Sequence, residues 1–309
     1  MRVLAVVPGP ERHGVVVHGV AVARAVGADV VRDLAPVSAD AVHVQFTDAL
    51  FGPDIASAAT AFERWRSCVD GPVVVTLHDV PGADDDRDRD ARRTAGYARV
   101  VQAADAVVVS AEHEAARLRH LTTPWVVPLL VPRLAASGPV PDWAGPPSVG
   151  VLGFVYPGKG HDVALEVAAE HGVRCVVAGG PSPGHEPLVA ALRHRAEALG
   201  VDLHVTGGLT EADLHAAARA VTAPLAAYRT LGASGSLATW HAACRRPVVT
   251  ASDYARELDR RWPGCVRITD DVLSAVGLAL ADPGSTWLQE PPQLDVAREH
   301  LAVFRSVLR

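Results

Sequence analysis

Short apolar runs alternate with helical patterns along almost the whole chain, and this alternation restricts the possible folds more than any other feature. The apolar runs are Val3–Val7, Ala41–Phe46, Val73–Leu77, Ala106–Val109, Trp125–Val127, Val149–Leu152, Cys175–Ala178, Leu203–Thr206, Val221–Leu225 and Val248–Thr250. The helical patterns between them include Val15–Val26, Ile55–Cys68, Ala111–Leu121, Val163–Glu170, Pro187–Leu199, Glu211–Ala220 and Ser236–Cys244. Apolar runs without polar alternation are typical of parallel strands that are covered on both faces. The sequence therefore predicts an α/β fold.

A proline-rich stretch interrupts this alternation near the middle of the chain, with six prolines from Pro128 to Pro147. After it, Val149–Gly160 repeats the strand, glycine-bearing turn and helix start of Val3–Gly14. We therefore expect two doubly wound, Rossmann-like domains that face a cleft, with ligands at the carboxyl ends of the strands. The predicted parts are a first domain at 1–130, a linker at 131–147, a second domain at 148–290 and a C-terminal helix within 291–309. That helix has one apolar face, and the first domain is one candidate surface for it.

Composition excludes several classes of protein. The formal net charge of −6 and the pI near 6.1 argue against a protein that binds nucleic acid by neutralising its phosphates. The four cysteines are scattered without metal-ligand spacing, which favours reduced thiols in the cytoplasm over disulfides or a metal site. No apolar run is long enough for a transmembrane segment, so we expect any membrane contact to be peripheral.

Lys159 is the only lysine among 29 lysine and arginine residues. It lies in the turn Tyr156–Gly160, between an apolar run and a helical pattern. The glycines of this turn allow a ligand to approach the backbone, and the following helix offers unpaired N–H groups and a partial positive charge. The pattern indicates a site for a phosphate or diphosphate. The alternative is an ordinary solvated turn in a chain whose composition is poor in lysine.

The second half of the chain resembles the donor-binding domain of GT-B glycosyltransferases, specifically the retaining family 4 enzymes that use nucleotide sugars. The resemblance rests on Val149–Phe154 followed by Gly158–Gly160, on Val176–Gly180, on Val205–Leu214, on Tyr228 and Arg229, and on Ala233–Leu237 with Arg246–Val249. It implies donor binding by Gly153, Lys159, Gly179, Gly180, Gly207, Leu209, Tyr228, Arg229, Ser234, Gly235 and Ser236.

The first half resembles the acceptor-side domain of the same family in fewer residues. These are His13 and Gly14 in the opening turn, Thr76–Asp79 after a strand, and Val108–Ser110 with Glu112. The resemblance implies that His78 acts with Lys159 in catalysis. It also implies that His13, Gly14, Asp79 and Glu112 lie on the acceptor side.

The chain departs from the family pattern at three positions. Phe154 stands where the family usually has an arginine, and Gly232 and Trp240 fall where it has a pair of glutamates. The resemblance implies a glycosyltransferase that moves a hexose-like group with retention, without metal or cofactor, from a nucleoside-diphosphate sugar to a small or lipid-linked acceptor. The departures leave two alternatives: a noncatalytic or repurposed GT-B nucleotide-binding protein, or a sugar-nucleotide epimerase. Donor sugar, base and acceptor stay open.

Overall fold

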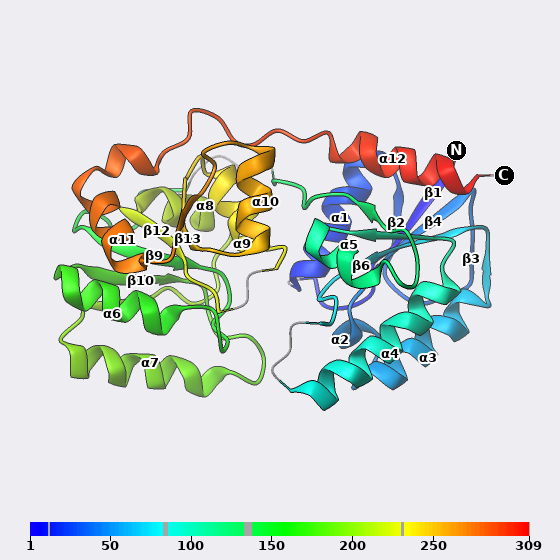
Figure 1. Cartoon of the computed structure of the whole chain (residues 1–309), viewed down its shortest axis with the longest axis horizontal. Helices are drawn as coiled ribbons and strands as arrows, with labels where there is room; N and C mark the ends of the chain where they lie inside the picture. The colour runs from blue at the N-terminus through cyan, green and yellow to red at the C-terminus, as the bar shows by residue number, and fades with distance from the viewer. Residues whose placement is uncertain (12, 83–85, 133–137, 230–231, 309) are drawn as a thin grey trace. The chain divides into compact units, whose positions relative to one another are not determined.

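A computed structural model describes residues 1–11, 13–82, 86–132, 138–229 and 232–308. Its contacts divide the chain into two compact units (Figure 1). Unit 1 consists of Met1–Leu130 and Leu294–Arg309, and unit 2 consists of Val131–Gln293. The C-terminal segment therefore belongs with the first part of the chain, although the whole of unit 2 separates them in sequence.

Unit 1 is built on a parallel sheet in the order β2-β1-β4-β6-β7-β8. Its strands are β1 (Val3–Val6), β2 (Asp29–Val31), β4 (Ala41–Phe46), β6 (Val73–Leu77), β7 (Ala106–Val109) and β8 (Trp125–Val126). A separate parallel pair joins β3 (Val37–Ser38) to β5 (Val69–Asp70). The strand order reverses direction between β1 and β4, which is where doubly wound sheets usually bind ligands.

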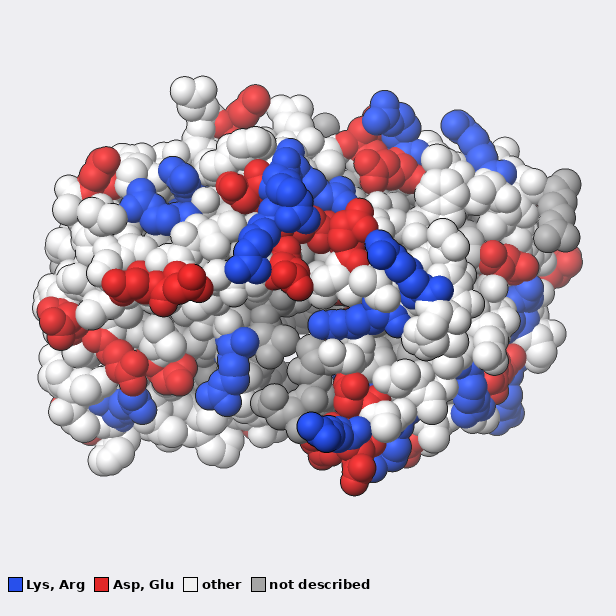
Figure 2. All heavy atoms as spheres, viewed as in Figure 1, with Lys and Arg blue, Asp and Glu red and all other residues white. Residues whose placement is uncertain are grey.

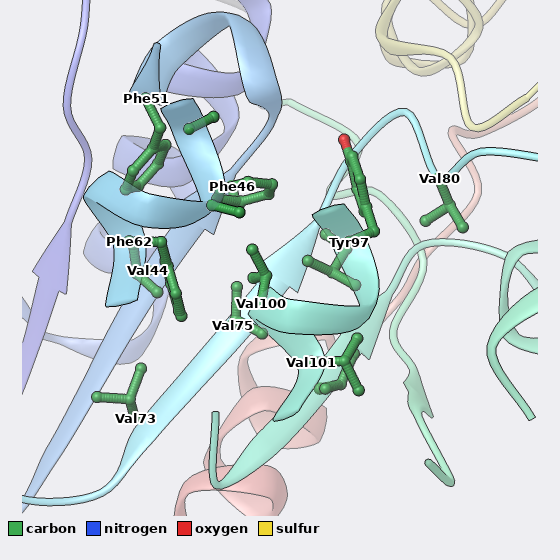
Figure 3. Packing of buried hydrophobic residues seen from close by; sticks show 14 of the residues in the cluster. Val44, Phe46, Phe51, Phe62, Val73, Val75, Val80, Tyr97, Val100 and Val101 are labelled. Atoms are coloured by element: carbon green, nitrogen blue, oxygen red, sulfur yellow. The ribbon is translucent and has the colours of Figure 1, made fainter. Parts of the chain in front are cut away.

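Helices cover both faces of this sheet. They are α1 (Gly14–Val26), α2 (Asp48–Phe51), α3 (Ile55–Arg66), α4 (Arg87–Ala103), α5 (Glu112–Leu118) and α12 (Val296–Val307). On one face, Phe62 of α3 and Tyr97 of α4 pack against Val44 and Phe46 of β4 and Val75 of β6 (Figure 3). On the opposite face, α12 lies beside α1 (Figure 1), and its apolar residues join those of β1 and β6.

Unit 2 has a parallel sheet in the order β11-β10-β9-β12-β13-β14. Its strands are β9 (Ser148–Leu152), β10 (Arg174–Ala178), β11 (Leu203–Val205), β12 (Ala223–Ala226), β13 (Val248–Thr250) and β14 (Arg267–Thr269). Numbered within the unit, the order is 3-2-1-4-5-6, the arrangement of dinucleotide-binding folds. The order reverses between β9 and β12, so this pair of strands marks the expected ligand position.

The helices of unit 2 connect successive strands. They are α6 (His161–His171), α7 (Glu186–Leu199), α8 (Glu211–Ala220), α9 (Gly235–Ala242), α10 (Asp253–Arg261) and α11 (Val272–Ala281), with a 3-10 turn at Pro283–Thr286. Leu165 of α6 and Val276 of α11 pack with Val151 and Leu225 of the sheet in one buried cluster. The α/β class and the doubly wound sheets that the sequence predicts are confirmed.

The proline-rich stretch packs on unit 2. Arg174 Nη1 donates a hydrogen bond to the Trp143 carbonyl at 2.6 Å, and the Trp143 ring lies 5.6 Å from that of His204. Gly138 N–H donates to the Ala212 carbonyl. The described part of the predicted linker is thus held by strands and a helix of unit 2.

Charged side chains of both signs are mixed on the face of the molecule that Figure 2 shows. Ion pairs among the described residues include Arg66–Asp105, Arg93–Asp48 and Arg99–Glu63. That face presents no broad basic field of the kind that follows a nucleic-acid backbone. In the described part of the chain, no helix has the length and apolar character needed to cross a bilayer.

Candidate functional site

Lys159 lies where the strand order of unit 2 reverses. It belongs to the turn between β9 and α6, while Ser236 belongs to the first turn of α9, beyond the end of the neighbouring strand β12. The ammonium Nζ donates a hydrogen bond to Ser236 Oγ at 2.9 Å. Lys159 is only 4% exposed. The topology therefore brings the two predicted donor-binding residues together below the surface.

Aromatic rings surround the ammonium on the protein side. Nζ lies 4.1 Å from the centre of the Tyr228 ring and 5.5 Å from that of Tyr156. Such contacts stabilise a cation without neutralising it. Within the described residues, Lys159 forms no ion pair with a carboxylate. A buried ammonium without a counter-ion is costly, so this arrangement favours the arrival of an anion.

Two predicted glycines let the chain pass close to Lys159. Gly153 follows β9 and has φ at +99°, and a Cβ there would lie 2.5 Å from Ser236 Oγ and 3.6 Å from Lys159 Nζ. At Gly179, which follows β10, a Cβ would lie 2.0 Å from the carbonyl oxygen of Gly153. Any side chain at either position would displace the backbone or the serine. The sequence requires glycine here because the ends of β9 and β10 touch.

The same edge continues to β11. Thr206 Oγ1 accepts a hydrogen bond from Gly179 N–H at 3.0 Å and donates to the Gly207 carbonyl at 2.9 Å. A Cβ on Gly180 would be 3.5 Å from Gly207, and Leu209 beyond it is half-buried. The predicted donor-binding residues from Ser236 to Leu209 therefore form a continuous line across the carboxyl ends of β12, β9, β10 and β11.

The remaining predicted donor-binding residues lie at the start of α9 and after β12. Ser234 is the N-cap, with its Oγ accepting from Leu237 N–H at 3.4 Å, and Gly235 is the first helical residue. Arg229 is exposed, and its backbone N–H donates to the Gly158 carbonyl. Residues 230 and 231 lie outside the described residues. A helix start beside a buried ammonium is a suitable position for phosphate oxygens.

Sequence reasoning missed His161 and left Trp240 open. His161 opens α6 directly after the lysine turn, and its Nε2 is buried with no hydrogen-bond partner in the described structure. Burial, with a smaller effect of the nearby Lys159 charge, lowers the pKa of His161 to about 4, so the ring is neutral at pH 7. The sequence signal was its place one residue after Gly160. Trp240 is fully buried, so its ring is not accessible for stacking on a nucleotide.

In unit 1, His78 and Asp79 follow β6 at the carboxyl edge of the sheet. His78 Nε2 lies 2.8 Å from Gln45 Oε1, and its ring lies edge-on to that of His18 at 5.6 Å. The Tyr97 hydroxyl donates to the His78 carbonyl at 2.6 Å. Burial lowers the pKa of His78 to about 4, against an opposing effect of Asp79. His78 is therefore a neutral, firmly held imidazole.

Asp79 has a left-handed backbone, with φ at 53°, which a non-glycine residue adopts only when its surroundings impose it. Its carboxylate accepts a hydrogen bond from Thr47 Oγ1 at 3.0 Å, and its carbonyl accepts one from Arg93 at 2.8 Å. Thr47 follows β4, the neighbour of β6. The turn that carries His78 is thus tied to two other elements of unit 1.

The other predicted acceptor-side residues lie at helix starts. His13 caps α1, because its Nδ1 accepts a hydrogen bond from Val15 N–H at 3.3 Å, and Gly14 is the exposed first residue of that helix. Glu112 is exposed at the start of α5. The buried carboxyl of this helix is Glu114, whose Oε2 accepts from Ser110 N–H at 2.9 Å. Burial raises the pKa of Glu114 to about 7.

Solved structures define the class of fold. Neither a protein-family model nor a curated protein matches the sequence. Anabaena HepE in complex with UDP aligns with a TM-score of 0.63 at 12% identity, covering 100% of this chain and 96% of HepE. A glycosyltransferase from Rickettsia africae aligns with a TM-score of 0.62 at 11% identity, covering 100% and 98%. Sucrose-phosphate synthase from Thermosynechococcus elongatus aligns with a TM-score of 0.61 at 15% identity, covering 87% and 70%.

These neighbours are GT-B glycosyltransferases, and this chain has the GT-B fold. The likeness, at 11% to 15% identity, is a likeness of fold. HepE has also been solved with UDP and glucose and with UDP-glucose.

Proposed function

We propose that this protein transfers a hexose-like group from a nucleoside-diphosphate sugar to a small or lipid-linked acceptor, with retention and without a metal ion. The observation that carries the proposal is the buried ammonium of Lys159, hydrogen-bonded to Ser236 and without a carboxylate partner among the described residues. A site that holds an uncompensated positive charge beside a helix start is prepared for a diphosphate.

The line of glycines suggests how the donor lies. With the diphosphate at Lys159 and Ser236, the nucleoside would extend over Gly153 and Gly179 toward Leu209. β9 and β11 are two strand positions apart, which is about 10 Å for adjacent spacings of roughly 4.8 Å. The backbone of Gly179 and Gly180 leaves this path free of side chains. The UDP and UDP-glucose complexes of HepE support a nucleotide sugar as the class of donor.

The reaction breaks the bond between the anomeric carbon and the diphosphate oxygen and forms a bond from that carbon to an acceptor hydroxyl oxygen. The hydroxyl proton passes to the departing phosphate oxygen. Lys159, the Ser236 hydroxyl and the N–H groups at the start of α9 stabilise the negative charge that develops on the diphosphate. They need no reorganisation, because hydrogen bonds and aromatic rings already hold the ammonium in place.

Unit 1 would supply the acceptor side. His78 is neutral at pH 7 and can exchange hydrogen bonds with sugar hydroxyls, and Asp79 is held beside it in a strained turn. His13 and Gly14 lie at the start of α1, beyond the end of β1, and would line the same edge of the sheet. Glu114 is a buried carboxyl close to this edge and adds a group that titrates near neutrality.

Turnover with a panel of sugar nucleotides tests the proposal. Release of UDP or GDP, analysis of the product anomer and insensitivity to EDTA are the expected results. Calorimetric titration with UDP and GDP should show binding that the Lys159→Met variant weakens. Absence of both turnover and binding with every nucleotide would contradict the proposed function.

A noncatalytic nucleotide-binding protein is the second candidate. Two observations favour it: His13 is engaged as a helix cap, and Gly232 offers no side chain at a position where the family places a glutamate. Nucleotide binding at Lys159 with no glycosyl product from any donor would support this reading.

A further inference from the structure

A chain of buried polar side chains runs behind His78. Gln45 Oε1 lies 2.8 Å from His78 Nε2, and Gln45 Nε2 lies 3.1 Å from His43 Nε2. His43 Nε2 also lies 2.7 Å from Thr76 Oγ1. His43 and Gln45 are alternate residues of β4, so their side chains lie on the same face of the sheet. Gln45, His43 and Thr76 are each 1% exposed, so hydrogen bonds within the protein must satisfy them.

The C-terminal helix α12 places a further histidine, His300, against His43. His300 Nδ1 is 3.0 Å from the Val296 carbonyl. A carbonyl oxygen only accepts, so Nδ1 of His300 carries the hydrogen and Nε2 has the lone pair. The His300 ring packs on that of His43, with centroids 5.2 Å apart. Burial lowers the pKa of both histidines, so both rings are neutral.

The tautomer of His43 follows from its contact with Gln45. Gln45 Nε2 is an amide nitrogen, which only donates, so His43 Nε2 is the acceptor and the ring hydrogen is on Nδ1. In the described structure, His43 Nδ1 and His300 Nε2 are both buried without a hydrogen-bond partner. The single lone pair of His43 Nε2 then faces both the Gln45 amide nitrogen at 3.1 Å and the Thr76 hydroxyl at 2.7 Å.

The same orientation of the Gln45 amide sets the direction of its hydrogen bond with His78. Its NH₂ group donates to His43, so its oxygen faces His78 and accepts from His78 Nε2. Helix α1 holds this side chain in place, because a Cβ at Gly19 would lie 2.6 Å from Gln45 Cγ. The glycine therefore allows α1 to press directly on the stem of Gln45.

We propose that Gln45 is a positioning residue that holds His78 with its hydrogen on Nε2, so that Nδ1 presents a lone pair to a substrate hydroxyl. The inference rests on the proposed function of His78. With the opposite tautomer, an N–H group would meet the hydroxyl and could not accept a hydrogen bond from it. Orienting partners of a functional histidine fix its tautomer in this way, and their loss typically costs about 10- to 100-fold in activity.

The groups around His78 leave its ring neutral at pH 7, so the tautomer decides which ring nitrogen can accept a hydrogen bond. His18 and His13 come from α1 and its cap, Asp79 is the next residue, and Tyr97 of α4 donates to the His78 carbonyl. Burial is the dominant effect and keeps the ring neutral. A neutral ring has one hydrogen on two nitrogens, so the partner of Nε2 determines which nitrogen can accept.

The test uses the full chain with ¹⁵N-labelled histidine rings. Ring nitrogen shifts, assigned with a His78→Gln variant, should show the hydrogen of His78 on Nε2 in the wild type. Gln45→Met keeps the length of the side chain and removes the amide. We expect mixed tautomers and a kcat lower by about 10- to 100-fold, while the Kd for UDP changes by less than about twofold. Gln102→Met makes the same exchange at an exposed residue of α4 and should leave both unchanged.

Gln45→Glu supplies the conservative rescue. Its carboxylate can only accept from Nε2, so the tautomer should persist and the pKa of His78 should rise. A hydrogen on Nδ1 in the wild type would overturn the proposal, whatever the variants do. An unchanged tautomer and kcat in Gln45→Met would also overturn it. Because the shifts are measured without turnover, an inactive wild type with the expected tautomer would contradict only the proposed transferase function.

Discussion

The ammonium of Lys159 and the hydroxyl of Ser236 are 77 residues apart in sequence and 2.9 Å apart in space. The contact exists because β9 and β12 are neighbours in the sheet, while the chain visits β10 and β11 between them. A lysine after one strand and a helix start after the other are thereby brought to the same point. The fold thus builds an anion site from two segments, neither of which could form it alone.

Replacing Lys159 by Met should weaken nucleotide binding and stabilise the empty protein. The ammonium is buried without an ion-pair partner among the described residues, so its removal ends a desolvation cost in the free state. A phosphate then loses its charge-assisted hydrogen bond, worth about 1.5–3 kcal/mol, or roughly 10- to 150-fold in Kd. Thermal unfolding and UDP titration measure the two effects, with the exposed Arg305→Met as the control. A lower Tm combined with unchanged binding would contradict an anion site.

Gly153→Ala should disturb the site through a clash as well as through backbone strain. Gly153 has φ at +99°, and its new Cβ would lie 2.5 Å from Ser236 Oγ. Gly184 is a matched control, because it has φ at +82° and a Cβ added there would meet nothing within 4 Å. Strain alone costs about 1–3 kcal/mol, so Gly184→Ala should lose that much stability and keep nucleotide affinity.

Gly153→Ala should lose more stability than this control and should also bind UDP more weakly, because Ser236 and Lys159 must move. Adding Ser236→Ala to Gly153→Ala removes the clash, so the double variant should recover part of the stability. Denaturant unfolding of the four proteins gives the comparison. Equal losses of stability for the two glycine variants would show that a clash with Ser236 does not affect the free energy of unfolding.

The sequence predicts the buried strands well because burial on both faces leaves an unbroken apolar run. The bounds of β4, β6, β7 and β13 agree with the predicted ones to the residue. The strands β2, β3, β5 and β14 have no such signal, since they span two or three residues each and are partly exposed. Their existence depends on pairing with a neighbour, which a pattern within one short segment does not record.

The residues of the candidate site also divide into those that local sequence signals identify and those that depend on contacts between strands. The uniqueness of Lys159 and the glycines near it are local signals, and the sequence finds them. Tyr228 was predicted, but its ring contact with the ammonium depends on how β12 aligns with β9. Gln45 and His43 were missed because their partners, His78 and Thr76, lie just after β6 and on it, and only the register between β4 and β6 brings them together. Glu112 was predicted from the family resemblance, and Glu114 was missed because its burial depends on how the short helix α5 packs.

Stability should fall as the pH falls from 7 to 5. Burial lowers the pKa of His78, His161 and His241 to about 4, so these rings stay neutral in the folded protein while the unfolded chain binds protons below about pH 6.5. The unfolded state then binds more protons, and each group contributes at most about 1.4 kcal/mol per pH unit. Glu114 acts in the opposite direction, because its pKa of about 7 lets the folded state bind a proton first.

The net slope should therefore be positive, with the histidines exceeding the single opposing carboxyl. Urea unfolding at pH 7, 6 and 5 measures it. His161→Gln should reduce the slope by about one histidine, whereas the exposed His120→Gln should leave it unchanged. Stability that is constant or rises toward pH 5 would contradict the burial of neutral rings.

Arg245→Lys should destabilise unit 2 severely although the charge is kept. The Arg245 guanidinium is 1% exposed and donates to the carbonyls of Ala218, Val221 and Thr222 and to Thr286 Oγ1, at 2.6–2.9 Å. Its Cζ also lies 4.3 Å from the centre of the Trp287 ring. Lysine has three donors on one nitrogen and cannot reach these acceptors together, so buried carbonyls would be left unpaired. We expect a loss of about 3–5 kcal/mol, the usual result of breaking a buried charged network.

Arg219→Lys is the control, because it changes an exposed arginine over the same tryptophan and should cost under about 1 kcal/mol. Chemical denaturation of both variants separates the two outcomes. Equal stabilities would mean that the guanidinium geometry is not what joins α8, the residues that connect it to β12, and the Pro283–Thr286 turn.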